Sequence, residues 1–448
     1  MIKFTTSNTI LQRVYDAALS KSYANIQSFA GRRALVEGGG YEKIWIETQP
    51  MGGEMFAGYD MELARNNVML FMENQRGDGR LPGSIRLENG KLVPEFNKLQ
   101  GFCFAEPALN LYYWMERDAA YLKRLYECLE AYDAYLWRTR GSGGNGCLEA
   151  WCVTDTGEDG ALRYGDAPFW WTEETAPVGC AVVPIQSMDI MGYSFAARNT
   201  LAKISAILEN GGAERWQRDA DAVRAKIREY LWDDERGACF DRDKDGNVLP
   251  TLLHNNLRLM HWGAMYPDMA ERFVDEHLLD EEEFWTPMPL PSVAANDPLF
   301  RNSNGNDWSG QPEGLTYQRA VSALNNYGFA HLLNPLFGKL LNACSDCVFS
   351  QQFDTFTGAH SSKLDGYGPT MLSILEYTAQ TRGIRMAEGK LLWSAFARED
   401  SDFTIECRGK TYRLVGCDNA FEGFVNGRKV LGVPYGKRIV TDMDGEII

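Results

Sequence analysis

Residues 147–171, CLEAWCVTDTGEDGALRYGDAPFWW, form the most informative segment of the chain. Acidic and aromatic side chains are interspersed with glycine, a composition that disfavours both helix and strand. A loop of this length in a compact domain is usually functional or disordered, and its aromatic residues argue against disorder. Because aromatic rings stack on the C–H face of a sugar while carboxylates bind hydroxyl groups or move protons, the segment predicts a carbohydrate-binding loop.

The bulk composition limits the class of protein. A chain of 448 residues with 45% hydrophobic and 24% charged residues has room for a large core and for more than one domain. The net charge of −16 argues against a nucleic-acid partner, because binding to phosphates requires clustered lysine and arginine. We find no basic segment followed by an apolar one at the N-terminus, and no apolar run long enough to span a bilayer. We therefore expect a cytoplasmic protein with a small carbohydrate as substrate and no membrane partner; its oligomeric state is left open.

Neither a metal site nor a cofactor is expected. The ten cysteines are scattered, and we expect them to be reduced and mostly buried. Cys344 and Cys347 form a CxxC pair, but there is no second pair and the chain has only five histidines, which argues against zinc. Residues 241–246, DRDKDG, match the first half of a calcium-binding loop, but Leu252 stands where such a loop has glutamate, so we interpret the segment as a hairpin turn.

Helical periodicity recurs in pairs before residue 395, and few stretches there alternate with a period of two. The predicted helices span residues 5–31, 60–77, 102–114, 118–139, 188–208, 214–231, 252–262, 267–278, 314–327, 330–347 and 367–381. Residues 38–59, which are rich in glycine, are predicted to form an ordered loop. Long loops follow every second helix, a pattern that predicts an all-α toroid of inner and outer helices with functional loops on one side, over residues 1–395.

The pattern changes after Trp393. Short β-like runs occur at residues 404–407, 411–415, 422–425 and 429–433. Asn426-Gly427 between the last two runs is a strong signal for a two-residue hairpin. Residues 396–448 are therefore predicted to form a small antiparallel β domain.

Several motifs resemble those of one clan of enzymes. FWTPMPLPSV at 284–293 followed by DWSG at 307–310 resembles the six-hairpin toroid glycosidases, a clan that includes glycoside hydrolase family 63 and the family 37 trehalases. Residues 215–243, 353–377 and 58–67 are similar to other segments of these enzymes, in the same order along the chain. The likeness covers roughly residues 40–385. It implies an (α/α)6 barrel that hydrolyses a small α-linked glycoside with inversion of configuration.

The resemblance assigns the general acid to Asp159. The family carries this residue in a Glu-Ser-Gly-x-Asp segment, to which residues 155–159, DTGED, are similar. Asp155 and Glu158 would help to keep Asp159 protonated, since neighbouring negative charges raise a carboxyl pKa. The competing interpretation is that Asp159 forms a turn or caps a helix, as aspartate in a glycine-rich loop usually does.

Further residues are candidates for substrate binding. Asp60 matches the aspartate of the family's Trp-Asp pair, with Tyr59 in place of tryptophan, although an N-cap role fits Asp60 equally well. Arg163 is a candidate for binding a hydroxyl or a carboxylate beside Asp159. The alternative is that Arg163 forms a surface salt bridge. Trp308 matches a pocket tryptophan of the family, and Gln311 stands in the loop that follows it. The candidate stacking residues, for which core packing is the alternative, are Trp151, Trp170 and Trp171.

The position of the general base departs from the family. Its base is a glutamate in a Glu-x-Tyr-x-x-x-Thr-Gly segment, whereas residues 351–358 here read QQFDTFTG and place Gln351 at that position. An amide cannot take a proton from water, and inversion uses two carboxyl groups roughly 6.5–9.5 Å apart. Glu313 is the first candidate substitute and Asp354 the second. Gln351 and Asp354 are also expected to contact the substrate.

Two other classes of function stay open. Inverting phosphorolysis needs no base, because phosphate itself attacks, and residues 360–363, HSSK, could bind that anion. A sugar isomerase or epimerase on a related toroid belongs to the same class of alternatives. The third possibility is a protein that binds sugar without turnover, since Gln351 replaces the base. The leading hypothesis is an intracellular glycosidase with Asp159 and Glu313 as its catalytic residues.

Overall fold

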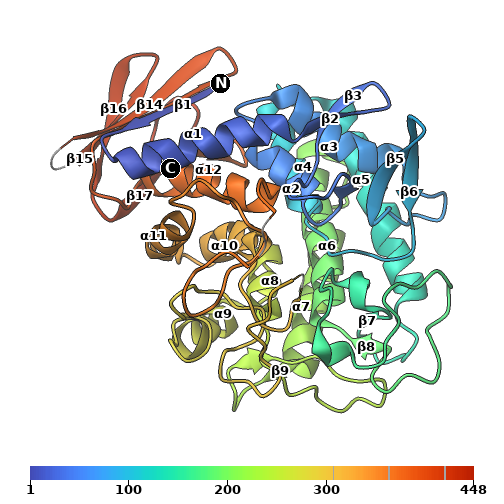
Figure 1. Ribbon diagram of the computed structural model, residues 1–448. Coiled ribbons are helices and arrows are strands. Elements are labelled where there is room, and N and C mark those ends of the chain that lie inside the picture. The colour runs from blue at the N-terminus through green and yellow to red at the C-terminus, as the bar shows by residue number, and fades with distance from the viewer. Residues whose placement is uncertain (306, 362–363, 418–419) are drawn as a thin grey trace.

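The computed structural model describes residues 1–305, 307–361, 364–417 and 420–448. Over these residues the chain forms α-helices α1 to α12 and strands β1 to β17 (Figure 1). The helices are α1 (Thr9–Ala24), α2 (Gln49–Met55), α3 (Met61–Glu73), α4 (Ala105–Trp114), α5 (Ala119–Thr139), α6 (Met188–Leu208), α7 (Ala213–Tyr230), α8 (Asn255–Trp262), α9 (Pro267–Phe273), α10 (Gly314–Asn326), α11 (Leu333–Ala343) and α12 (Gly368–Arg382). The strands are β1 (Ile2–Thr6), β2 (Ile26–Phe29), β3 (Arg32–Leu35), β4 (Ile44–Trp45), β5 (Ser84–Glu88), β6 (Lys91–Glu95), β7 (Glu149–Ala150), β8 (Ile185–Gln186), β9 (Trp232–Asp233), β10 (Ala238–Cys239), β11 (Ile384–Ala387), β12 (Lys390–Ala395), β13 (Ser401–Cys407), β14 (Lys410–Cys417), β15 (Ala420–Val425), β16 (Arg428–Pro434) and β17 (Lys437–Thr441).

Six helices form a closed cycle of contacts. α2 contacts α4, α4 contacts α6, and the series continues through α8, α10 and α12, which returns to α2. We call these six the inner helices. Five others pack against them: α3 on α2, α5 on α4 and α6, α7 on α6, α11 on α10 and α12, and α1 on α12, alongside which it lies in Figure 1.

Burial separates the inner helices from the others. Every residue of α12 from Gly368 to Arg382 is buried, and so is every residue of α8. By contrast, α7 buries a single stripe made of Trp216, Ala220, Val223 and Ile227. A helix that is buried all round is enclosed by protein, whereas one with a single apolar stripe has a face in solvent.

The segment that we expected to be a loop, residues 38–59, contains strand β4 and helix α2. Pro50 stands in the first turn of α2, where no backbone N–H is needed for helical hydrogen bonds. Gly52 allows close packing, since a Cβ atom there would lie 2.7 Å from Leu372 Cδ1 on α12. Gly52 is thus explained by a contact between two helices, which the local sequence does not reveal.

The helix expected over residues 5–31 is also different in the structure. β1 precedes it and pairs antiparallel with β13, with Phe4 opposite Phe403. α1 starts after Asn8, whose side chain accepts a hydrogen bond from the Leu11 N–H at 3.1 Å. The hairpin of β2 and β3 follows α1. Local periodicity misses β1 because its partner strand lies near the other end of the chain.

The C-terminal part of the chain forms two antiparallel sheets. One has the order β1-β13-β14-β15-β16 and the other the order β11-β12-β17. The hairpin expected at Asn426-Gly427 joins β15 to β16, and both loop residues have positive φ, 49° and 78°. The sheets take strands from both sides of the division predicted after residue 395, because β1, β11 and β12 all lie within residues 1–395.

Two further observations concern the whole described chain. None of the helices in the described ranges is both long and apolar enough to cross a membrane. The cysteines whose side chains the structure describes are all free thiols.

Candidate active site

Acidic side chains from four distant segments interact beside the starts of the inner helices. Glu313 directly precedes α10, Glu47 stands just before α2, Asp159 lies in the 147–171 loop, and Glu37 follows β3. Burial raises the pKa of Glu313 well above its ordinary value, and the charges of Asp159, Glu47 and Glu37 raise it further. A geometric contact agrees, because a Cβ atom on Gly157 in the 147–171 loop would lie 2.4 Å from Glu47 Oε2. We call these four residues the acid cluster.

Polar partners hold Glu47 and Glu37 in the acid cluster. Arg319 donates to Glu47 Oε2 at 3.0 Å, and Gln100 Nε2 donates to Glu47 Oε1 at 2.7 Å. Burial raises the pKa of Glu47 to about 7, against the opposing effect of the Arg319 guanidinium. The Tyr367 hydroxyl donates to Glu37 Oε1 at 2.9 Å, while burial and then the charge of Glu47 raise the pKa of Glu37 well above its ordinary value.

Glu313 lies beside the residue at the family's base position. The Gly314 N–H donates to the Gln351 carbonyl at 2.8 Å, and Glu313 pairs with Gln352 in an antiparallel bridge. Gly314 is required here, because a Cβ atom would lie 1.9 Å from Thr370 Oγ1 at the start of α12. The backbone therefore brings the 313 and 351 segments side by side, and the positive end of the α10 dipole favours a negative charge at Glu313.

The loop that carries Asp159 is joined to the DWSG motif. The Trp308 N–H donates to the Asp159 carbonyl at 3.0 Å, and the Leu162 N–H donates to Ser309 Oγ at 2.7 Å. Trp308 is buried, with its ring centroid 5.4 Å from that of His254 and the Arg258 guanidinium over its face at 5.2 Å. Asp159 and Trp308 are thus neighbours through their backbones.

A buried ion pair anchors the same loop. Asp155 and Arg140 are both buried and bonded to each other. Asp155 also accepts hydrogen bonds from the Leu99 N–H at 2.9 Å and the Trp151 N–H at 2.8 Å. Burial alone would raise the pKa of Asp155, but the Arg140 charge and the hydrogen bond from the Trp151 N–H lower it below its ordinary value. The aspartate therefore holds the 147–171 loop as a charged group.

Glu158, expected to act on Asp159, has cationic partners of its own. Arg163 and Arg258 lower the pKa of Glu158 well below its ordinary value, although burial opposes them. Asp155 is neutralised by Arg140 in the same way. Asp155 and Glu158 are thus each paired with a cation. Besides the charge of Asp159, the negative charges that raise the pKa of Glu313 are those of Glu47 and Glu37.

Three of the expected substrate contacts make structural interactions. Arg163 is buried and forms ion pairs with Glu158 and Asp241. Trp151 is buried, its Nε1 donates to Glu149 at 3.0 Å, and the Arg140 guanidinium covers its ring. Trp171 is half-buried and donates from Nε1 to the Thr175 carbonyl at 2.8 Å.

Tyr59 and Asp60 lie in another setting. Asp60 caps α3, accepting from the Leu63 N–H at 3.0 Å, and forms an ion pair with Arg33 at 2.7 Å. The Tyr59 hydroxyl lies 2.6 Å from that of Tyr15. These interactions correspond to the alternative that we gave for Asp60, an N-cap, and none of them involves the acid cluster.

The remaining candidates surround Glu313 or the turn after Gln351. Gln351 Oε1 accepts from the Tyr41 hydroxyl at 3.0 Å, and Gln311 is buried and donates to Asn302 at 3.0 Å. Asp354 accepts from two backbone N–H groups of its own turn and from Asn302 Nδ2 at 2.7 Å. Burial tends to raise the pKa of Asp354, but these hydrogen bonds lower it below its ordinary value. The Asp354 carboxylate therefore binds groups of its own loop.

The anion site considered for phosphorolysis is only partly visible. Ser362 and Lys363 lie outside the described residues. His360 Nε2 lies 3.3 Å from Asp346 Oδ1. The side chains described here place a carboxylate next to His360, which disfavours a phosphate at this point.

Sequence reasoning missed Glu37 and Glu47. Both fall in or next to the segment interpreted as a loop, so no helix start drew attention to them. Glu47 follows Trp45 by two residues and stands at the entrance to an inner helix. We matched the family's pattern of a tryptophan and an acid before an early inner helix to Tyr59 and Asp60. Trp45 and Glu47 offer a similar pattern before α2.

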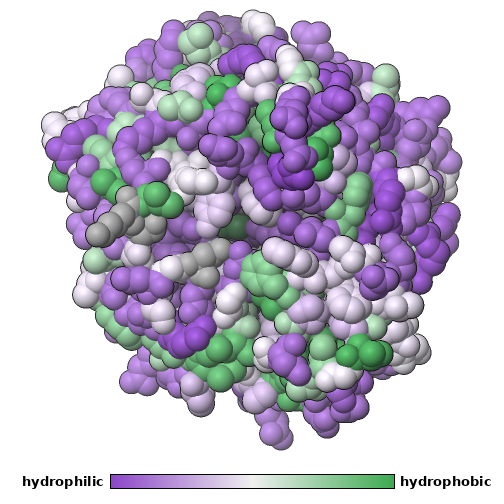
Figure 2. All heavy atoms as spheres, turned by 45° about the vertical axis from the view of Figure 1, so that its right-hand side comes forward, coloured by the Kyte–Doolittle hydropathy of each residue, from purple (hydrophilic) through white to green (hydrophobic). Residues whose placement is uncertain are grey.

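Figure 2 shows the molecule with the side that carries β5 and β6 turned forward. A hollow opens near the centre of this face, and mainly hydrophilic residues surround it. Strand β4 pairs with β5 and leads directly to Glu47. This face therefore belongs to the same region of the molecule as the acid cluster.

Comparison with known proteins connects this site with an enzyme family. A family model described as the mannosylglycerate hydrolase MGH1-like glycoside hydrolase domain matches residues 54–368. Asp159 and Glu313 fall within the match, whereas Glu37 and Glu47 precede it. The search of curated proteins found no significant match.

Solved structures share the fold at low sequence identity. The GH63 mannosylglycerate hydrolase from Thermus thermophilus in complex with Tris has a TM-score of 0.67 at 18% identity, over 82% of this chain and 100% of that chain. Neutral trehalase Nth1 from Saccharomyces cerevisiae has a TM-score of 0.58 at 13% identity, over 78% of this chain and 74% of that chain. A structure described as a sialidase reaches 0.74 at 12% identity, over 99% of this chain but 41% of that chain. The first two are six-hairpin glycosidases, which confirms the resemblance found in the sequence.

The anchoring role of Asp155 is testable. Asp155→Asn is expected to lower the free energy of unfolding by about 3–5 kcal/mol, because the buried Arg140 guanidinium loses its counter-charge. Urea denaturation measures this. The matched control Asp402→Asn removes the same charge from a pair with Arg413 that is partly exposed, and is expected to cost about 0–1 kcal/mol. Equal losses in the two variants would contradict the anchoring role.

Proposed function

We propose an inverting mechanism for this chain, which belongs to the family of mannosylglycerate hydrolase MGH1-like glycoside hydrolase domains. The chain is a glycosidase on the strength of that family. The proposal concerns what the family match leaves open: inversion, a small α-linked glycoside or disaccharide as substrate, and the roles of individual residues. A cytoplasmic location and a division into residues 1–395 and 396–448 stay predictions.

We further propose that the inner helices are the inner ring of an (α/α)6 toroid. The closed cycle of contacts from α2 through α12 back to α2 supports this arrangement. The likeness of fold to the two six-hairpin glycosidases supports it as well. In such a ring the inner helices all start at the same end of the barrel. The segments that lead into them, which carry Glu47, Glu313 and Asp159, therefore meet at that end.

The observation that carries the mechanism is the electrostatic coupling of Glu313 to Asp159. Two carboxyl groups that interact in a buried site do not both ionise readily, so the pair keeps one proton over an interval of pH. A protonated acid with an ionised base is the state that inversion requires. We assign the acid role to Asp159 and the base role to Glu313. Burial favours the proton on Glu313, but the α10 dipole favours a negative charge there, and the reactive form is the one in which the proton is on Asp159.

The proposed step balances as follows. Glu313 takes a proton from a water molecule while the oxygen of that water forms a bond to the anomeric carbon. The bond from this carbon to the leaving oxygen breaks on the opposite face of the sugar, and Asp159 gives its proton to that oxygen. The products are a sugar of inverted configuration and a free alcohol.

The pairing of the 313 and 351 segments explains how a glutamine can occupy the family's base position. Glu313 lies on the backbone segment that is hydrogen-bonded to Gln351. In the proposed mechanism Glu313 therefore supplies, from the neighbouring segment, the carboxylate that residue 351 lacks. The Oε1 atom of the Gln351 side chain accepts a hydrogen bond from the Tyr41 hydroxyl at 3.0 Å, which holds this amide beside Glu313.

The surroundings of the acid cluster favour a small substrate. Glu313, Trp308 and Glu37 are all buried, so an extended polysaccharide would have little room. Lys98 is buried too, its ammonium lies 4.9 Å from the Trp45 ring centroid, and it interacts electrostatically with Asp159. A glycosylated small acid would share the positive charge of Lys98 with Glu95, whose Oε2 lies 3.6 Å from the ammonium.

Leaving-group dependence separates the two catalytic roles. Asp159→Asn is expected to lower kcat/KM for an alkyl glycoside by about 10²–10⁴-fold, because its alcohol must be protonated on departure. The same variant should retain most of its activity on a dinitrophenyl glycoside, whereas Glu313→Gln should lose activity on both substrates. Exposed Glu42→Gln serves as the control and should match the unaltered protein.

Two results would contradict these roles. Full activity of Asp159→Asn on the alkyl glycoside would remove Asp159 as the acid. Turnover that requires inorganic phosphate and releases a sugar phosphate would replace hydrolysis with phosphorolysis. Proton NMR of the first-formed anomer tests inversion in the same reactions.

The pH profile provides a separate test. Glu313 must be ionised to act, so activity falls as the pH drops through its pKa, and burial places that pKa well above the ordinary value of glutamic acid. On the dinitrophenyl glycoside, Asp159→Asn should show this acidic limb alone, because no acid proton remains to be lost at high pH. An unchanged alkaline limb in Asp159→Asn would contradict the assignment.

A further inference from the structure

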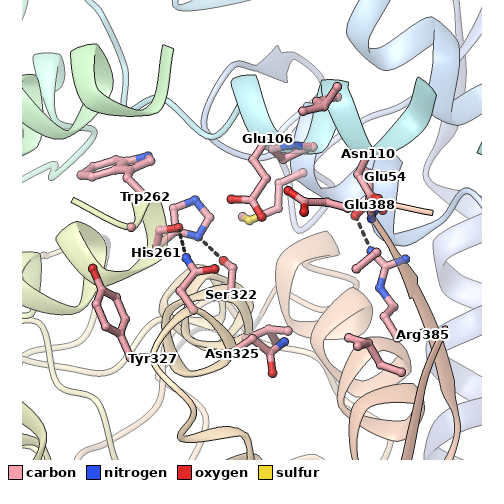
Figure 3. A pocket seen from close by; sticks show the side chains of 18 of the residues that line it. Glu54, Glu106, Asn110, His261, Trp262, Ser322, Asn325, Tyr327, Arg385 and Glu388 are labelled. Atoms are coloured by element: carbon pink, nitrogen blue, oxygen red, sulfur yellow. Dashed lines mark hydrogen bonds and ion pairs between the residues drawn. The ribbon is translucent and has the colours of Figure 1, made fainter. Parts of the chain in front are cut away.

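A second cavity lies at the opposite end of the inner helices. Its volume is about 800 Å³, within the range of small-molecule sites. Side chains from all six inner helices line it, and the β11–β12 hairpin closes one side (Figure 3). On α10, Ser322 and Asn325 face this cavity, and Asn325 stands about 18 Å along the helix axis from Glu313. We call it the rear cavity.

Buried side chains separate the rear cavity from the acid cluster. Arg319, between Glu313 and Ser322 on α10, donates to Glu47 and to Cys103 Sγ. The Trp262 Nε1 donates to the Phe102 carbonyl at 2.7 Å, and both residues are buried. The rear cavity is therefore a separate space.

A charged network forms one wall. Arg385 is buried, donates from Nε to Glu376 Oε1 at 2.7 Å and forms an ion pair with Glu54. Asn110 donates to Glu54, and Gln380 donates to Glu376 at 2.8 Å. Buried charges are costly unless paired, and in this wall each of them has partners.

Glu106 is different. In the part of the chain that the structure describes, its carboxylate has no hydrogen-bond or ion-pair partner, and Figure 3 shows it directed into the rear cavity. The nearby ammonium of Lys203 is paired with Glu388 instead. A half-buried carboxylate without a partner is an acceptor that a ligand can use.

His261 supplies a second polar group. Its Nδ1 is hydrogen-bonded to the Ser322 hydroxyl, which also contacts the Arg319 carbonyl at 3.3 Å. Burial, then Arg319, lower the pKa of His261 to about 3, which keeps the ring neutral. A neutral imidazole in the lining of the rear cavity can exchange a hydrogen bond with a hydroxyl group of a ligand.

The rest of the lining indicates the class of ligand. Four acidic side chains, Glu54, Glu106, Glu376 and Glu388, are balanced by four basic ones, Lys203, Arg224, Arg385 and Lys390. A ligand of large net charge therefore gains nothing from the site. Trp262 and Tyr327 contribute aromatic rings, and Asn199, Asn325 and Asn326 contribute amides. Aromatic rings, amides and free acceptors together suit a neutral molecule with many hydroxyl groups.

We propose that the rear cavity is a second carbohydrate site, which binds a neutral mono- or disaccharide without cleaving it. Glu106 accepts hydrogen bonds from its hydroxyl groups, and the neutral His261 ring exchanges a hydrogen bond with one of them. Cleavage is not expected, because glycoside hydrolysis uses two carboxyl groups and Glu54 and Glu376 are both bound to Arg385. The site stands on its own geometry and does not depend on the roles of Asp159 and Glu313.

Equilibrium dialysis with labelled glucose, mannose and galactose, which have no glycosidic bond to cleave, tests the proposal on the unaltered full chain. At least one of these sugars should bind at two sites per chain. Adding Glu106→Gln should weaken one site by roughly tenfold, the effect of losing a hydrogen bond to a charged group. Adding Glu116→Gln, an exposed change near the end of the same helix, should alter neither site.

A second measurement covers the case in which Glu106→Gln fails to fold. Hydrogen exchange of the unaltered protein should slow over residues 384–395 when the sugar is added, because β11 and β12 line the rear cavity. A single site for every sugar with no such protection would overturn the proposal. Spermidine that protects residues 384–395 where sugars do not would overturn it in favour of a cationic ligand.

Discussion

The burial of several carboxyl groups in one place is the constraint on which this structure depends. Glu313, Glu47 and Glu37 are each buried; Glu47 and Glu37 both raise the pKa of Glu313, and Glu47 also raises that of Glu37. Such a group is stable only where donors and positive charge surround it. Arg319 and Gln100 supply them for Glu47, Tyr367 supplies a hydroxyl for Glu37, and Glu313 stands at the positive end of α10.

The arrangement of helices makes this concentration of charge possible. The closed cycle of contacts brings Glu47, Glu313 and Tyr367, each at the start of an inner helix, into one region. Asp155 and Arg140 then fix the 147–171 loop, and Trp308 binds the backbone of Asp159. At the other end of the same helices, Arg385 joins Glu54 to Glu376 beside the rear cavity. One scaffold thus holds buried charge at both ends, with catalysis assigned to one end and binding to the other.

Much of this architecture could be predicted from the sequence, and the failures have physical causes. Periodicity finds the helices whose burial follows a stripe, such as α7, and the Asn426-Gly427 hairpin is fixed by local backbone preference. α2 was missed because the reason for Gly52 is a contact with α12, and β1 was missed because its partner is at the far end of the chain.

The site was predicted unevenly for the same reasons. Asp159, Trp308 and Glu313 came from motifs and lie together, whereas Glu37 and Glu47 were hidden in the segment interpreted as a loop. Arg163 and Trp151 belong to buried networks that no motif distinguishes from a substrate clamp. The most direct test of the central claim is a crystal structure of Asp159→Asn with an intact α-glycoside bound. The account predicts residue 159 and Glu313 on opposite faces of the sugar, their carboxamide and carboxylate groups about 6.5–9.5 Å apart, with a water molecule on Glu313. A bound sugar whose anomeric carbon faces Glu37 or Glu47, with Glu313 turned away, would contradict it.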